Sequence, residues 1–78
     1  MRSLDRAIEV LEVLENAEVR LRLSEISKRC NLHIATTQRI LNALERRGRV
    51  DVNNGGYAIG LAAVVGAHSY AINSRIIM

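Results

Sequence analysis

Guanidinium and amide side chains, which form paired hydrogen bonds, cluster in the middle of this 78-residue chain. Residues 28–49 contain six basic residues and one acidic residue, a balance of +5, whereas the whole chain carries +3. Arginine binds phosphate or the guanine edge through two parallel hydrogen bonds, and glutamine or asparagine pairs with adenine in the same way. The basic residues of this window are Lys28, Arg29, Arg39, Arg46, Arg47 and Arg49. Such a cluster indicates a surface that binds a nucleic acid, although a solvated helix face has a similar composition.

A helix predicted from Ile34 to about Arg47, ending at Gly48, sorts these side chains onto two faces. The predicted inner face is mostly apolar and consists of Thr37, Ile40, Leu41 and Leu44. The opposite face consists of Ala35, Arg39, Asn42 and Arg46, flanked by Thr36, Gln38 and Ala43. The arginines therefore point outward, and the small alanines permit close approach of a partner.

Each candidate contact has an expected role. Arg39 is the candidate for reading a base or binding an adjacent phosphate, because the one acidic residue nearby, Glu45, lies on another face. Gln38 and Asn42 either read adenine or are ordinary solvated amides. Thr36 is expected to hold a phosphate. The remaining candidates for contacts with the nucleic-acid backbone are Ser24, Ala35, Thr37, Arg46, Arg47 and Arg49, with Thr37 directed either to a phosphate or to the core.

The segments before this helix are expected to support it. A first helix is predicted from a cap at Ser3 to about Ala17, with its acidic face pointing away from nucleic acid. Its inward stripe is predicted to contain Leu4, Ile8, Leu11 and Leu14. The alternating segment 19–23 predicts a short strand. A second helix is predicted from a cap at Ser24 to Cys30, with Asn31 as a left-handed stop.

A hairpin is predicted after the basic helix. Residues 49–52 and 57–59 resemble strands, and the Asn-Asn-Gly-Gly segment 53–56 supplies residues that accept a positive φ. From Leu61 onward the pattern predicts another helix. The fold class is therefore α+β, mostly α: a winged helix-turn-helix with a three-helix core and a small antiparallel sheet, followed by a further helix.

The composition argues against several other classes of function. With one cysteine and two widely spaced histidines, Cys30, His33 and His68, no metal site and no internal disulfide are expected. The sequence shows no nucleophile–base pair, carboxylate dyad or phosphate-binding glycine loop, so neither enzymatic activity nor a cofactor is expected. Aromatic residues make up 3%, too few for stacking on single strands. No apolar run is long enough to cross a membrane, and a cytoplasmic location is expected.

Several motifs, taken in register, resemble the N-terminal DNA-binding domain of IclR-type transcriptional regulators. They are Ser3-Leu-Asp-Arg6-Ala7, Leu11-x-x-Leu14, Leu23-Ser-Glu25-Ile26-Ser, Leu32-x-x-x-Thr36-x-x-Arg39-Ile-Leu41-x-x-Leu44-x-x-x-Gly48 and Tyr57-Ala-Ile-Gly60-Leu61. The resemblance implies a DNA-binding domain over residues 1–60, with Thr36, Gln38 and Arg39 at the major groove. It also implies that residues 61–78 begin a linker helix to an effector-binding domain absent from this chain, and that a small-molecule effector acts only through that domain.

Three residues or segments depart from the family pattern. The family often has proline where this chain has His33, so the entry to the basic helix is expected to be less rigid. Thr37 stands where an apolar residue is usual. The segment 53–56 has no lysine or arginine, which argues against insertion of an arginine from the wing tip into the minor groove.

The sequence thus predicts a bacterial transcriptional regulator, such as a repressor, that binds double-stranded operator DNA as a homodimer. Dimerisation is expected through the first helix, the linker helix or both. One alternative is a winged-helix module that binds a protein, although such a module should carry apolar anchors on the outer face of its third helix. Another is a different winged regulator, such as a MarR-like one, which has dimerisation helices on both sides of the winged unit.

Overall fold

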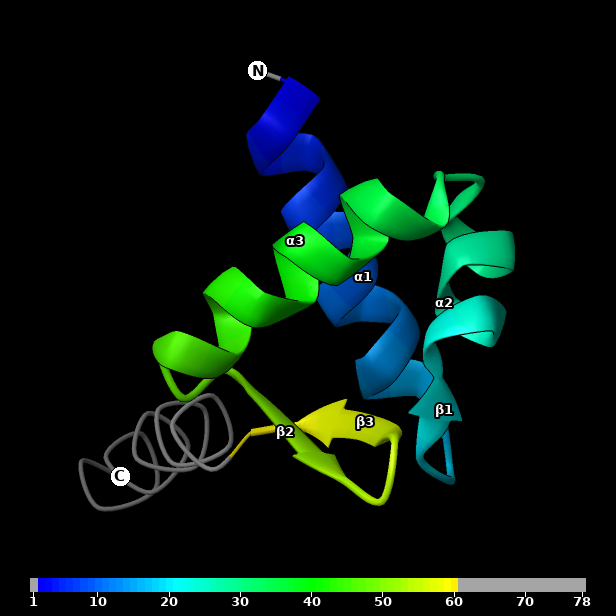
Figure 1. Cartoon of the computed structure of the whole chain (residues 1–78), viewed down its shortest axis with the longest axis vertical. Coiled ribbons are helices and arrows are strands. Elements are labelled where there is room, and N and C mark those ends of the chain that lie inside the picture. Colours follow the sequence, from blue (N-terminus) through cyan, green and yellow to red (C-terminus); the bar gives the residue numbers. More distant parts are fainter. Residues whose placement is uncertain (1, 61–78) are drawn as a thin grey trace, which may run out of the picture.

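The structure is a computed structural model and describes residues 2–60. It contains, in order, α1 (Arg2–Asn16), β1 (Leu21–Arg22), α2 (Leu23–Cys30), α3 (Ile34–Arg46), β2 (Val50–Asn53) and β3 (Gly56–Ile59). The three helices pack against one another, and the sheet lies where α1 and α3 end (Figure 1). This order confirms the predicted α+β winged helix-turn-helix. The predicted helix over residues 61–78 and the domain boundary at residue 60 stay predictions, because residues 61–78 lie outside the described part.

Helix α1 differs from the prediction in its cap and in its apolar stripe. The helix already includes Arg2, so Ser3 lies within the first turn and is not the cap. Leu14 is buried as predicted, together with Val10, which the predicted stripe omitted. Leu4 and Ile8 are 56% and 45% exposed, and their predicted burial is wrong. The reason is visible in Figure 1, where the first turns of α1 project past the other helices.

Helix α2 begins two residues earlier than expected and ends as expected. Its N-cap is Arg22, whose backbone N–H donates to Oε1 of Glu25 at 3.0 Å. The predicted cap at Ser24 is therefore wrong, since the Glu25 carboxylate already satisfies the backbone donor at this helix start. At the other end, Asn31 adopts the left-handed conformation with φ 54° and ψ 49°. That left-handed stop was predicted and is confirmed.

The sheet is fully antiparallel, with strand order β1-β3-β2. The predicted strand over residues 19–23 is shortened to two residues, because Val19 is exposed and Leu23 already belongs to α2. The hairpin is confirmed. Its turn has Asn54 at φ 52° and Gly55 at φ 78°, and two successive positive φ values match the right-handed twist of the flanking strands.

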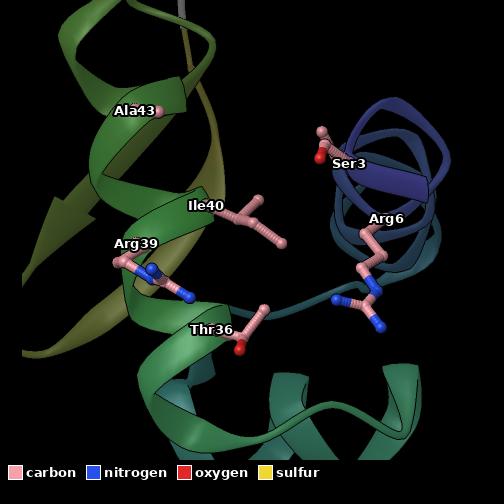
Figure 2. A pocket seen from close by; sticks show the side chains of 7 residues that line it. Ser3, Arg6, Thr36, Arg39, Ile40 and Ala43 are labelled. Atoms are coloured by element: carbon pink, nitrogen blue, oxygen red, sulfur yellow. The ribbon is translucent and has the colours of Figure 1, made fainter. Parts of the chain in front are cut away.

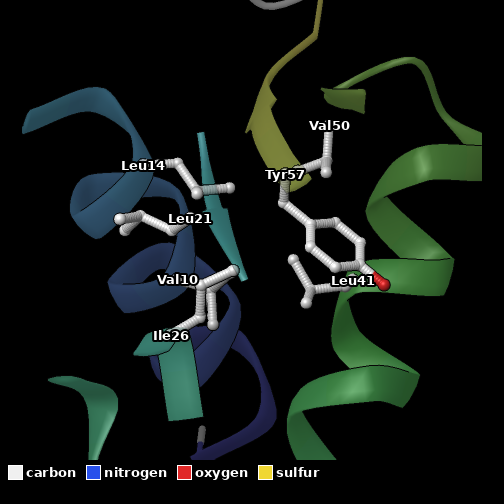
Figure 3. Packing of buried hydrophobic residues seen from close by; sticks show 7 residues of the cluster. All are labelled: Val10, Leu14, Leu21, Ile26, Leu41, Val50 and Tyr57. Atoms are coloured by element: carbon white, nitrogen blue, oxygen red, sulfur yellow. The ribbon is translucent and has the colours of Figure 1, made fainter. Parts of the chain in front are cut away.

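The core lies between the helices and the inner face of the sheet (Figure 3). All six elements contribute to it: β3 adds one aromatic ring, and the other five add aliphatic side chains. The buried cluster consists of Val10, Leu14, Leu21, Ile26, Leu41, Val50 and Tyr57. Because α3 contributes Leu41 to this cluster, its orientation is set by packing against the rest of the domain.

Candidate nucleic-acid interface

Helix α3 presents the two faces that its sequence predicts. Thr37 and Leu41 are completely buried, and Ile40 and Leu44 are half-buried. The outward face is exposed and consists of Ala35, Arg39, Asn42 and Arg46, with Thr36, Gln38 and Ala43 half-buried beside it. The structure therefore brings most of the predicted contact residues onto one accessible helix face.

Thr37 is the exception among the predicted contacts on α3. Its side chain is 0% exposed, and its hydroxyl donates to the carbonyl oxygen of His33 at 2.9 Å. Of the two predicted orientations, the core orientation is the one observed, and a DNA contact through Thr37 is wrong. The buried hydroxyl has a hydrogen-bond partner, so this polar residue is tolerated in the core.

The two amides of α3 are joined to each other and to the wing. Nε2 of Gln38 donates to Oδ1 of Asn42 at 2.9 Å and to the hydroxyl of Tyr57 at 3.1 Å. Tyr57 comes from β3, and its ring is almost fully buried beside Leu41 (Figure 3). Sequence reasoning missed Tyr57, because nothing in the sequence indicates that this hydroxyl reaches a side chain 19 positions earlier.

A cleft separates the start of α1 from the outer side of α3 (Figure 2). The guanidinium groups of Arg6 and Arg39 reach toward it from its two sides, with the Thr36 hydroxyl between them. The lining consists of Ser3, Arg6, Ala7, Thr36, Arg39, Ile40 and Ala43 and includes no carboxylate. Two guanidinium groups and two hydroxyls can donate hydrogen bonds to an anion, so the cleft suits an anionic ligand. Sequence reasoning missed Arg6, because its position at the cleft depends on how α1 packs beside α3.

Arg20 holds the wing against the body of the domain. Its Nη1 donates to the carbonyl oxygens of Asp51 and Gly56 at 3.2 and 3.1 Å, and its Nη2 donates to the Asp51 carboxylate at 2.5 Å. Its side chain crosses β3 directly over Gly56, where an added Cβ would lie 2.9 Å from the Cβ of Arg20. The guanidinium of Arg20 is therefore used within the protein.

Arg22, the arginine of β1, supplies the positive charge that the wing tip lacks. Nη1 of Arg22 lies 3.0 Å from the place of a Cβ at Gly55, so its guanidinium lies against the turn. The register that pairs Arg22 with Gly56 brings it there. Sequence reasoning missed this proximity, because it depends on a pairing between distant segments.

The remaining predicted contacts are exposed, one on α2 and the others at the C-terminal end of α3 or just after it. Ser24 lies in the first turn of α2, Arg46 in the last turn of α3 and Arg49 between α3 and β2. Arg47, also exposed, is the C-terminal cap of α3. Across residues 2–60 the one ion pair joins Arg20 to Asp51, so these arginines have no carboxylate partner in that range.

Residues 3–53 match the family model of the IclR helix-turn-helix domain, which covers the segment from α1 to β2. The chain belongs to the IclR family. A curated relative, the HTH-type transcriptional regulator XynR of Escherichia coli (strain K12), is 30% identical over 70 residues, or 87% of this chain. The chain spans 28% of the length of that relative.

Two solved structures show the same fold. An IclR transcriptional regulator from Alicyclobacillus acidocaldarius is 29% identical, with a TM-score of 0.79 over 88% of this chain. HmgR of Pseudomonas aeruginosa is 21% identical, with a TM-score of 0.78 over the same share. The chain covers 29% of each of these two proteins. Its fold is therefore the winged helix-turn-helix of IclR regulators.

Two departures from the IclR pattern, His33 and Thr37, lie in contact. His33 has φ −65°, the value that a proline ring would impose. Both the backbone N–H and the hydroxyl of Thr37 donate to the His33 carbonyl at 2.9 Å. The threonine thus holds the entry to α3 in this IclR-family domain, where the family often has proline.

The other polar groups of this IclR-family domain form no metal-binding cluster in the described segment. Residues 2–60 contain no group of three His, Cys, Asp or Glu side chains that could hold a metal ion. Burial, and to a lesser extent the negative charge of Glu9, raises the pKa of Cys30 and keeps its thiol protonated at neutral pH. None of the helices in this range is both long and apolar enough to span a membrane.

Proposed function

We propose that this IclR-family domain binds duplex operator DNA with α3 in the major groove, as the DNA-reading part of a bacterial transcriptional regulator. The observation that carries the proposal is the outward face of α3, where Arg39, Asn42 and Arg46 are exposed and free of carboxylate partners within residues 2–60. A major groove admits one α-helix, and its base edges match guanidinium and amide groups.

The contacts divide into base readers and phosphate binders. Arg39 reads a base, and the amides of Gln38 and Asn42 lie beside it on the same helix. Ala35 permits close approach at the start of α3. The proposed phosphate contacts are Ser24, Thr36, Arg46, Arg47 and Arg49, together with Arg6, which lines the cleft, and Arg22, which lies at the wing tip.

Arg39→Ala is expected to cost about 1–3 kcal/mol of binding free energy at one base pair and little elsewhere, because a bidentate contact to guanine is sequence-specific. Duplexes selected from a genomic-fragment pool by the wild-type protein provide the operator. Binding of that operator and its single-base variants, measured against salt, then gives the loss at each position.

Arg6→Ala is the matched control, because it removes a guanidinium from the same cleft on the side of α1. Its loss should be similar for all sequences, and the slope of log K against log salt should become shallower by about 0.9 for the lost phosphate contact. If Arg39→Ala behaves like Arg6→Ala, Arg39 is a phosphate contact and not a base reader.

A protein-binding module is the competing function, and the surface of α3 does not favour it. Interaction helices present clustered apolar anchors. On α3 the exposed large apolar residue is Ile34 at its first position, 53% exposed and next to exposed Ala35. A single exposed aliphatic side chain is ordinary on a protein surface. The protein-binding function would be favoured if the wild type binds no DNA and the Arg39→Ala and Arg46→Ala variants still bind a protein partner.

Homodimerisation through α1 is a further part of the proposal, supported by Leu4 and Ile8, which are exposed one turn apart on that helix. Sedimentation equilibrium is expected to show a dimer at micromolar to millimolar concentrations. Ile8→Glu is expected to shift it to monomer without loss of helix, because the side chain contributes little to the core. Val19→Glu, which charges another exposed aliphatic position, serves as the control. Wild-type monomers over this range would contradict self-sufficient dimerisation.

The regulator is further proposed to be cytoplasmic and to respond to a small molecule through an effector-binding domain joined by residues 61–78. The chain belongs to the IclR family and spans only part of the length of its relative, which supports a separate effector-binding domain. Repression of the gene next to the selected operator, lost with Arg39→Ala, would test the regulatory part.

A further inference from the structure

We propose that Tyr57, a residue of the wing, positions the Gln38 and Asn42 amides of α3 so that they read base edges as one unit. The inference rests on the proposed DNA binding and adds a residue that does not itself face the groove. Tyr57 is 8% exposed, and its hydroxyl lies at the inner side of α3 (Figure 3). It accepts a hydrogen bond from Nε2 of Gln38 at 3.1 Å.

The hydrogen bonds of the two amides determine which of their polar groups remain free to contact DNA. Nε2 of Gln38 has two hydrogens, and both are used, one toward Tyr57 and one toward Oδ1 of Asn42. Within residues 2–60, Oε1 of Gln38 and Nδ2 of Asn42 make no such bond. The pair therefore offers one acceptor, from Gln38, and one donor group, from Asn42.

This arrangement changes how the amides can read DNA. A single amide that reads adenine must accept from N6 and donate to N7. While Nε2 of Gln38 donates to Tyr57 and Asn42, it has no hydrogen to donate to N7 of adenine. The acceptor and the donor come instead from Gln38 and Asn42, one helical turn apart, so the two amides read adenine jointly.

Tyr57 is suited to fix this geometry before DNA arrives. Its ring is packed in the buried cluster with Leu41 and Val50, so the hydroxyl is held by the core and not by a mobile surface chain. Gln38 is half-buried and would otherwise sample several rotamers. Ordering a side chain in the free protein removes that entropy loss from the binding step.

The test is Tyr57→Phe, which removes the hydroxyl and keeps the ring. The wild-type and variant proteins are each used to select from a pool of fully randomised duplexes. The variant should keep its affinity for the unselected pool and its salt dependence. At the positions where Gln38→Ala also loses base preference, the preference of the variant should fall about threefold to tenfold. This is the change expected from the loss of one hydrogen bond.

Two further variants separate positioning from stability. In a Gln38→Ala background, Tyr57→Phe should have no additional effect on base preference, since the side chain that it positions is gone. Ser27→Ala removes another largely buried hydroxyl, on α2, and should leave base preference unchanged. Exchange of the Gln38 side-chain NH2 protons, followed by nuclear magnetic resonance, should accelerate in Tyr57→Phe and not in Ser27→Ala.

Unchanged base preference in Tyr57→Phe would overturn the inference, as would an equal loss for all sequences or an effect that persists without Gln38. If the wild-type protein binds duplexes without preferring any sequence, the positioning role of Tyr57 is overturned, whereas binding to the DNA backbone still stands. A wild-type protein that binds no duplex at low salt would overturn the proposed function and the reading role of Tyr57 together.

Discussion

Leu41→Ala is expected to lower the free energy of unfolding by about 2–5 kcal/mol, the range for truncating a fully buried leucine. Leu41 is 0% exposed and joins α3 to the cluster that includes Ile26 and Tyr57. A domain of this size has a total stability of about 3–9 kcal/mol. The variant should therefore lose a large fraction of its stability, and DNA binding should fall with the folded fraction.

Urea denaturation followed by circular dichroism measures this loss. Ile34→Ala is the matched control, because it shortens an aliphatic side chain on the same helix that is half exposed. It should change stability by less than about 1 kcal/mol, as surface substitutions usually do. Equal losses for Leu41→Ala and Ile34→Ala would contradict the burial pattern of α3.

Gly60→Ala is expected to destabilise the joint between α3 and the wing by about 1–3 kcal/mol or more, as overpacking does. A Cβ at Gly60 would overlap the carbonyl oxygen of Gly48 and lie 2.8 Å from the backbone nitrogen of Val50. These are backbone atoms, so no side-chain rotation relieves the overlap. The backbone N–H of Gly60 also donates to the Arg49 carbonyl at 2.8 Å, and that bond should be lost.

Thermal unfolding of Gly60→Ala should be compared with that of Gly55→Ala. Gly55 has φ 78°, so alanine there is strained by about 1–2 kcal/mol. Its added Cβ meets only the guanidinium end of Arg22, which can move. Gly55→Ala should therefore be milder and confined to the turn. A Gly60→Ala protein with the wild-type midpoint would show that the close approach is not required.

The faces of α3 could be predicted because helical periodicity alone assigns them. Thr37 and Leu41 point inward and Arg39 outward, whatever the rest of the chain does. The same reasoning failed for Leu4 and Ile8 of α1, although their spacing is also helical. Periodicity tells which side of a helix is apolar, but the length of the neighbouring elements decides how much of that side is covered.

The other misses concern interactions that spacing does not encode. Ser24 has the residue type of a helix cap, but Glu25 satisfies the donor of the residue before the helix. Arg6, Arg22 and Tyr57 join the candidate interface only through packing and strand pairing. Their roles depend on three-dimensional proximity, which one sequence without its fold does not supply.

The antiparallel pairing of Leu21 with Tyr57 closes a loop of chain that contains both α2 and α3. Closing a loop costs chain entropy, which the burial gained on closure must offset. If β3 detached from β1, Tyr57 would leave the core, and α3 would lose one of its packing partners together with the hydrogen bond between Gln38 and Tyr57. Local opening of the wing and release of the Gln38 amide are thus coupled, so proteolysis that frees β3 would loosen the reading helix while α1 and α2 still pack against it.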